Sequence, residues 1–385
     1  MDQEEYERLA LKSASYEKKQ ESLLSRIQWS GDLRLRQENL WYEPDPLGDD
    51  RSDRARFRYR LRVGAVAPIN DYVTAGFRLA TSEDNNIRSE NQSVGQDEPD
   101  FNFDGIFIDQ AYLDFKAPKG WLGESFSLDL IGGKMANPFL WKNGKDSLLW
   151  DNDIAPEGGA IVFTTRPTEQ WSFFANTGYF VDQENSTAGD PHVLGLQGGF
   201  AVTPAEATEI GGRASFYSWD SLDQAFFDRG EDFGNLPGGL EDSFSVGELA
   251  TYFRYAGFEG WPLLVFGQFA QNFDAEDTPG AGSEDAGWGV GVEVGDGKKW
   301  VLLGAGYYRE EANFWPAQLT DSDRFDGFTN RKGWTLYGTR QLFANTDLIL
   351  TLFNSDAIDD DVPPFGESVP DSDRYRLDAD ILVKF

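Results

Sequence analysis

The chain has 385 residues, with 66 acidic and 34 basic side chains, a formal net charge of −32, no cysteine and one histidine. This composition excludes a disulfide framework, a cysteine nucleophile and a multi-histidine metal centre. The negative charge also opposes binding along a nucleic-acid backbone, which requires clustered Lys and Arg. Because His192 has no evident serine and aspartate partners, we do not expect an enzyme. We also expect no cofactor.

The first 26 residues have the composition of a helix, since residues 2–26 are rich in Glu, Lys and Leu and contain neither Gly nor Pro. A seam with alternating spacings of three and four residues, typical of a coiled coil, runs through Tyr6, Leu9, Ser13, Tyr16, Gln20, Leu23 and Ile27. Three interpretations stay open. The segment is a solvated helix, a short coiled coil that ties several copies together, or a helix that enters the lumen of the following domain.

From about residue 27 to the C-terminus, apolar residues recur at every second position. In the segment 54–68, RARFRYRLRVGAVAP, apolar side chains alternate with five arginines. The segment 374–385 alternates in the same way, with Arg374 and Arg376 on the polar face. We count about sixteen such segments, each of which predicts a strand with one apolar and one polar face.

The connections between these segments are of two alternating kinds. Seven short ones, such as 67–71 and 295–299, alternate with eight long ones, such as 84–102 and 311–332. A soluble sandwich gives no reason for this alternation, whereas a transmembrane barrel has short turns at one end and long loops at the other. We therefore predict an all-β fold: a transmembrane antiparallel up-and-down β-barrel of about sixteen strands over 27–385, with 1–26 as a periplasmic helical segment.

The net charge is concentrated in the long loops. The eight long loops hold 40 of the 66 acidic and 8 of the 34 basic residues, so the rest of the chain is electrically balanced. The sequence therefore predicts that one rim of the barrel carries essentially the whole negative charge.

If the apolar face of these strands meets lipid, the alternating arginines point into the lumen. Those of segment 54–68 climb about 20 Å of wall, and counting across the first hairpin places Arg34 and Arg36 beside Arg60 and Arg58. The predicted pore-lining arginines are Arg34, Arg36, Arg54, Arg56, Arg58, Arg60, Arg62, Arg374 and Arg376. The third long loop offers possible counter-charges at Asp146, Asp151, Asp153 and Glu157. Ion pairing that merely holds this loop in place is the alternative role, and the two roles are compatible.

The C-terminus ends on an aromatic residue after apolar residues at alternate positions. Tyr375, Leu377, Ile381, Val383 and Phe385 lie on one face of the last predicted strand. This pattern resembles the terminal signature by which the outer-membrane assembly machinery recognises its clients.

The segment 131–159, IGGKMANPFLWKNGKDSLLWDNDIAPEGG, resembles the inward-folded constriction loop of sixteen-stranded porins. Its GKMANPF, LLWDND and PEGG elements, with DQAYLDF at 109–115, look like those of the bacterial putative-porin family. The N-terminal coiled coil is similar, more loosely, to that of trimeric dicarboxylate porins. The resemblance implies a homotrimer in the outer membrane of a Gram-negative bacterium, with both termini periplasmic and a constriction loop at about 136–158.

We therefore expect an outer-membrane porin for passive diffusion of small hydrophilic solutes and ions, surrounded by lipid and lipopolysaccharide. Two alternatives stay open: a channel selective for anions such as carboxylates, and a structural tether with a plugged lumen. Acidic clusters at 151–157, 274–285 and 356–361 lack the spacing of a dedicated calcium loop. They are solvated loops, or weak Ca²⁺ bridges to neighbouring lipopolysaccharide.

Overall fold

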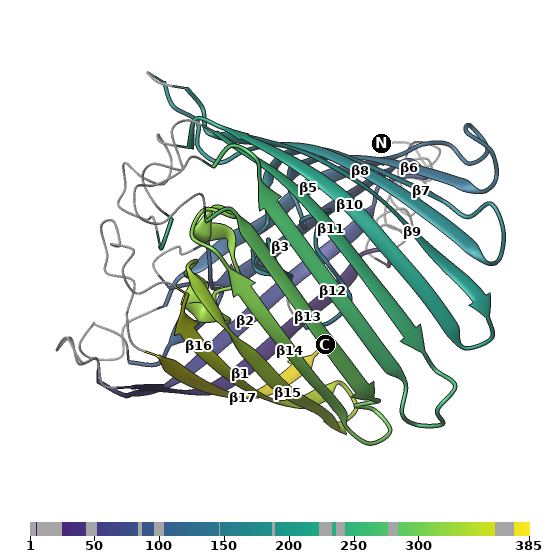
Figure 1. Ribbon diagram of the computed structural model, residues 1–385. Helices are drawn as coiled ribbons and strands as arrows, with labels where there is room; N and C mark the ends of the chain where they lie inside the picture. The colour runs from purple at the N-terminus through teal and green to yellow at the C-terminus, as the bar shows by residue number, and fades with distance from the viewer. Residues whose placement is uncertain are drawn as a thin grey trace.

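The computed structural model describes Glu5 and residues 25–43, 52–83, 87–95, 104–145, 147–186, 189–222, 233–235, 243–275, 284–358 and 373–385. In this part of the chain, sixteen antiparallel strands form the wall of a closed barrel (Figure 1). They are β1 (Gln28–Tyr42), β2 (Arg54–Pro68), β3 (Val73–Thr81), β5 (Ile106–Lys116), β6 (Phe126–Lys134), β7 (Glu157–Thr165), β8 (Trp171–Val181), β9 (His192–Ala205), β10 (Thr208–Asp220), β11 (Ser243–Tyr255), β12 (Leu263–Asn272), β13 (Ala286–Gly295), β14 (Leu302–Glu310), β15 (Arg331–Phe343), β16 (Thr346–Ala357) and β17 (Arg374–Lys384). The predicted seam residues Tyr6, Leu9, Tyr16 and Leu23 lie outside the described residues, as does Asp146.

The barrel closes because β1 pairs with both β2 and β17. All other wall strands pair with the wall strands before and after them, and the two-residue β4 (Gln92–Ser93) lies against β2 at Arg58 and Tyr59. The prediction of a sixteen-stranded up-and-down barrel is therefore confirmed. The count across the first hairpin is also correct, since Arg34 lies opposite Arg60 and Arg36 opposite Arg58.

The connections alternate in length as the sequence predicts. The longest of the seven short ones is 117–125, and all of them lie at the same end of an up-and-down barrel as the hydrogen-bonded pair Gly31 and Phe385. The eight long ones lie at the other end. We call 135–156 the third loop and 311–330 the seventh loop; the seventh loop contains the short 3₁₀ helices η3 (Ala317–Leu319) and η4 (Phe325–Gly327).

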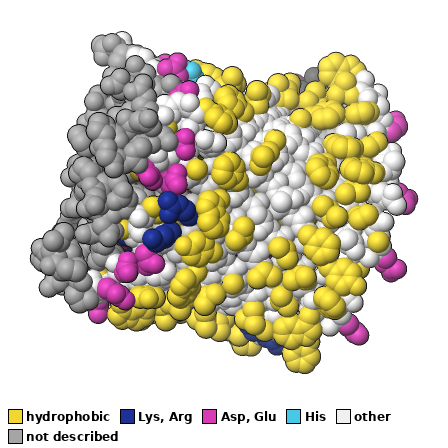
Figure 2. Space-filling view, in the orientation of Figure 1, with side chains coloured by type: hydrophobic (Ala, Val, Ile, Leu, Met, Phe, Trp, Pro, Cys, Tyr) yellow, Lys and Arg dark blue, Asp and Glu magenta, His cyan; other side chains and the backbone are white. Residues whose placement is uncertain are grey.

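The two faces of the wall differ as period-two alternation requires. Large apolar side chains such as Leu35 and Phe57 are 54% and 65% exposed on the outside, whereas Arg36, Arg58 and Arg60 are buried inside. Figure 2 shows hydrophobic side chains spread over the outer wall, with Asp and Glu near its two ends. Among the described residues, no helix is both long enough and apolar enough to cross a membrane.

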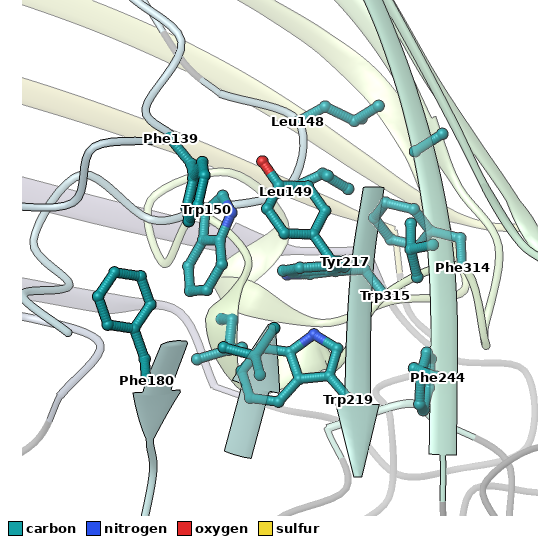
Figure 3. Packing of buried hydrophobic residues seen from close by; sticks show 14 of the residues in the cluster. Phe139, Leu148, Leu149, Trp150, Phe180, Tyr217, Trp219, Phe244, Phe314 and Trp315 are labelled. Carbon is teal, nitrogen blue, oxygen red and sulfur yellow. The ribbon is translucent and has the colours of Figure 1, made fainter. Parts of the chain in front are cut away.

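The third and seventh loops fold into the barrel and pack against inward-facing aromatic side chains. Phe139 and Trp150 of the third loop contact Tyr217 of β10, with ring centroids 5.3 and 5.8 Å apart. Trp315 of the seventh loop lies 5.1 Å from the ring of Trp150 (Figure 3). These fully buried rings form a dry core against β8, β10 and β14. The lumen is thus filled by protein on this side.

Candidate functional site: the charged wall of the lumen

The predicted arginines of β1, β2 and β17 form one continuous ladder, because these three strands are neighbours in the closed barrel. In each strand these arginines occupy the alternate positions whose side chains point into the lumen, which we call the inward parity of the strand. Arg36 lies at the centre and forms ion pairs with Asp380 at 2.7 Å and with Asp378 at 2.9 Å. The central cation of the ladder is therefore paired with acids on the same wall.

Two further acids of the wall bind the remaining rungs. Glu38 is fully buried and pairs with Arg56, with Arg58 at 3.2 Å and with Arg376 at 2.9 Å.

Asp32 pairs with Arg60 at 2.9 Å and with Arg62 at 2.7 Å. Sequence reasoning did not assign Asp32, Glu38, Asp378 or Asp380 to the site. All four acids occupy inward-facing alternate positions of their strands, as the arginines do, and this alternation is the sequence signal that predicts their place in the site.

The third loop supplies less counter-charge than expected. Asp153 lies 3.4 Å from Arg60 and so contacts the ladder. Asp151 instead accepts the backbone N–H of Ser322 at 2.8 Å and so joins the third loop to the seventh.

Glu157 does not face the ladder. It begins β7 with the outward parity of Ile161, and its side chain is 64% exposed and pairs with Lys134 at 2.7 Å. The reason is that the third loop has already rejoined the wall at this residue. The counter-charge role expected of Glu157 is therefore not what the geometry gives.

The seventh loop, which sequence reasoning did not assign to the site, supplies Asp323 and Asp326. Asp323 accepts hydrogen bonds from Arg36 at 2.8 Å and from Arg376 at 2.7 Å. Asp326 pairs with Arg374 and, at 3.3 Å, with Arg376. Burial alone would raise the pKa of Asp323, but the nearby arginines outweigh it and hold that pKa well below the usual range.

The second long loop adds Glu90, which lies 3.1 Å from Arg62, 3.3 Å from Arg78 and 3.6 Å from Arg60. Burial, followed by the charge of Asp153, raises the pKa of Glu90 to about 8. The pKa of Asp153 is lowered, because the neighbouring arginines outweigh its own burial.

Three cations of the lumen and its rim differ from the other rungs. Arg54, at the loop end of β2, is exposed to solvent. Arg34 donates to the amide oxygen of Asn91, and Lys145 of the third loop donates to Thr351 at 3.0 Å and lies 4.5 Å from the ring centroid of Phe353. Among the described residues, neither Arg34 nor Lys145 has a carboxylate within 4.0 Å.

A cavity of about 200 Å³ opens beside the ladder. Its lining includes Thr81, Ser82, Glu90 and Asp153 on the polar side and Trp150 of the dry core on the apolar side. The cavity therefore leaves room for water beside the carboxylates that contact the ladder. Within the described part of the chain, no three acidic or histidine side chains are arranged to hold a metal ion.

The last strand places its alternate apolar residues on the outside. Tyr375 is exposed on the outer wall, and Leu377, Ile381 and Val383 share its parity. Phe385 follows the strand, and its backbone exchanges two hydrogen bonds with Gly31, at 2.8 and 3.0 Å. The C-terminal residue is thus tied to the first strand.

A closed barrel with an apolar outer wall and a charged interior is a transmembrane β-barrel of the outer-membrane type. Comparison of the sequence with family models gives a match to the putative-porin family over residues 30–228, and the chain belongs to that family. Family and fold indicate a channel in the outer membrane rather than an enzyme.

Solved structures show the same fold. The high-pH structure of Pseudomonas putida OprB matches with a TM-score of 0.55 and 11% identity, covering 96% of this chain and 97% of that one. The outer-membrane channel DcaP of Acinetobacter baumannii gives 0.51 and 12%, and Salmonella typhi OmpF in complex with daunomycin gives 0.50 and 12%. Both matches cover 93% of this chain and 97% of the other. No curated protein sequence matches the chain.

Proposed function

We propose that the protein is a porin that lets small hydrophilic solutes and ions diffuse passively along its arginine ladder, with a preference for small anions. The observation that carries the preference is the pair Arg34 and Lys145, which lack a carboxylate partner among the described residues while most other rungs are neutralised. Glu90 adds to the preference, since a carboxyl with a pKa of about 8 is mostly neutral at pH 7.

The preference is tested by reversal potentials of single channels in a salt gradient. We expect the variants Arg34→Gln and Lys145→Gln each to shift the reversal potential toward cations. Lys299→Gln is the matched control, because it removes the same charge from an exposed short turn. Unchanged potentials in both lumen variants would refute the anion preference, whereas absence of any conductance in the wild type would refute the porin function.

A plugged structural tether is the second candidate, and the dry aromatic core of the third and seventh loops favours it. These loops fill one side of the lumen with fully buried rings such as Trp150 and Trp315. Swelling of liposomes that contain the protein distinguishes the two candidates. A porin admits a small sugar and the liposomes swell, whereas a plugged barrel gives no swelling.

Trimer formation and the assembly signal belong to the same proposal. The family resemblance and the seam of residues 2–26 support a homotrimer with periplasmic termini, and the outward alternation on β17 supports recognition of the C-terminus by the assembly machinery. Deleting residues 2–25 and measuring the mass in detergent tests the seam. A monomer would support its role, and an unchanged trimer would show that the barrel walls suffice.

A further inference from the structure

Asp323 and Arg324 are adjacent in the seventh loop and bind different strands of the barrel wall. The guanidinium of Arg324 is almost fully buried and donates to Glu310 of β14 at 2.8 Å. It also donates to the backbone carbonyls of Ser147 at 3.0 Å and Leu148 at 3.3 Å in the third loop. Arg324 therefore fastens the seventh loop to the wall and to the third loop at once.

The backbone around Asp323 is fixed by further hydrogen bonds. The carboxylate of Asp321 accepts the N–H groups of Asp323 and Arg324, both at 2.9 Å. Asp151 of the third loop donates its N–H to the carbonyl of Leu319 at 2.7 Å. The two loops thus form one hydrogen-bonded unit. Contacts within this unit, and not only those with the ladder, fix the position of Asp323.

Asp323 contacts the ladder rather than β14. Its carboxylate joins Arg36 of β1 to Arg376 of β17, and its side chain is still 22% exposed. Arg34 and Lys145, the two cations without a carboxylate partner among the described residues, are close enough to Asp323 to stabilise its charge. The negative charge of Asp323 therefore lies between the paired and the unpaired cations.

We propose that the seventh loop is a second constriction element, in which Asp323 is the specificity-determining residue and Arg324 the positioning residue. This inference rests on the proposed function and deepens it. Asp323 limits the anion preference that Arg34 and Lys145 create, so that neutral dipolar solutes and small anions both pass. Without its charge the passage becomes strongly selective for anions.

The decisive variant is Asp323→Asn, measured as the anion-to-cation permeability ratio of single channels. Removing one unit charge at about 4 Å from a passing ion in water changes the energy of an anion and of a cation by about 1 kcal/mol each, in opposite directions, which predicts a rise of about 30-fold in this ratio. Glu311→Gln is the matched control, because it removes the same charge from the same loop, and among the described residues Glu311 forms an ion pair with Arg309 and accepts the N–H of Ala286, both outside the ladder. The control should leave the ratio unchanged.

A second variant tests the positioning role of Arg324. The double substitution Arg324→Gln and Glu310→Gln removes the clamp without leaving an unpaired buried charge, so the barrel should still fold. We expect the permeability ratio to rise as in Asp323→Asn, together with added noise in the open-channel current. The conservative variant Asp323→Glu keeps the negative charge and should therefore keep the wild-type ratio.

Three results would overturn the inference. The first is an unchanged ratio in an Asp323→Asn channel of ordinary conductance, and the second is added noise in that variant without a change of ratio, which indicates a merely structural role. The third is an equal rise in Glu311→Gln. Failure of the proposed function is separate, because a wild-type protein without conductance or swelling would show it before any variant is compared.

Discussion

A buried ion pair anchors the start of the third loop, and breaking it should cost far more than breaking an exposed pair on the same strands. Arg213 of β10 donates to Glu248 of β11 at 2.7 Å and to the carbonyl of Phe139 at 2.7 Å, and both charged side chains are almost fully buried. The substitution Arg213→Met removes the cation, and among the described residues Glu248 then keeps the hydroxyl of Ser215, at 2.7 Å, as its hydrogen-bond donor.

An uncompensated buried charge costs about 3–5 kcal/mol in free energy of unfolding. The matched control is Arg254→Met, since Arg254 pairs with Glu209 between the same two strands at 3.0 Å with about 40% of each side chain exposed. An exposed pair of this kind contributes about 0–1 kcal/mol. The double variant Arg213→Met and Glu248→Leu removes both buried charges, so it should recover most of the loss.

Unfolding of the refolded barrel in urea, followed by tryptophan fluorescence, measures the change through the midpoint. The reasoning is refuted if Arg213→Met loses no more stability than Arg254→Met. It is also refuted if the double variant is as unstable as the single one, because an unpaired charge would then not be the cause.

Two further predictions concern Glu90 and the inner wall. Because burial and the charge of Asp153 raise the pKa of Glu90 to about 8, raising the pH from about 7 to about 9 ionises Glu90 and should lower the anion preference. Reversal potentials in Glu90→Gln should lose this pH dependence, and an unchanged profile would contradict the assignment. Gly304→Ala should lower the free energy of unfolding by about 1–3 kcal/mol, since a methyl group there would lie 2.1 Å from the ring of Tyr337. Gly338→Ala, whose nearest atom would be 3.5 Å away, is the control and should unfold at the wild-type urea concentration.

Because charges in the lumen are paired, the net charge of the chain does not by itself predict the ion selectivity of the channel. The long loops hold an excess of acids that equals the whole net charge of −32, and this excess favours cations near the mouth. Below it, Arg36, Arg58 and Arg60 are largely neutralised by acids of the wall. The selectivity that we propose therefore depends on single unmatched charges rather than on totals.

The sequence by itself determined the barrel, the number of its strands and the inward side of each strand. Period-two alternation and turn length are local properties, since each side chain alternates with its own neighbours along the strand. For the same reason the pairing of Arg34 with Arg60 and of Arg36 with Arg58 could be counted across one hairpin. The family resemblance pointed to the third loop but left its side-chain directions open.

Only the tertiary structure decided which acids meet which arginines. Glu157 lies on the third-loop segment that was expected to face the ladder, yet the register of β7 turns it outward to Lys134. Asp323 lies 287 residues from Arg36 in sequence and reaches it because barrel closure brings the seventh loop over β1 and β17. Sequence periodicity cannot predict such a contact, because side chains alternate in direction along a strand but not along an irregular loop. The path of the seventh loop depends instead on its packing against the third loop.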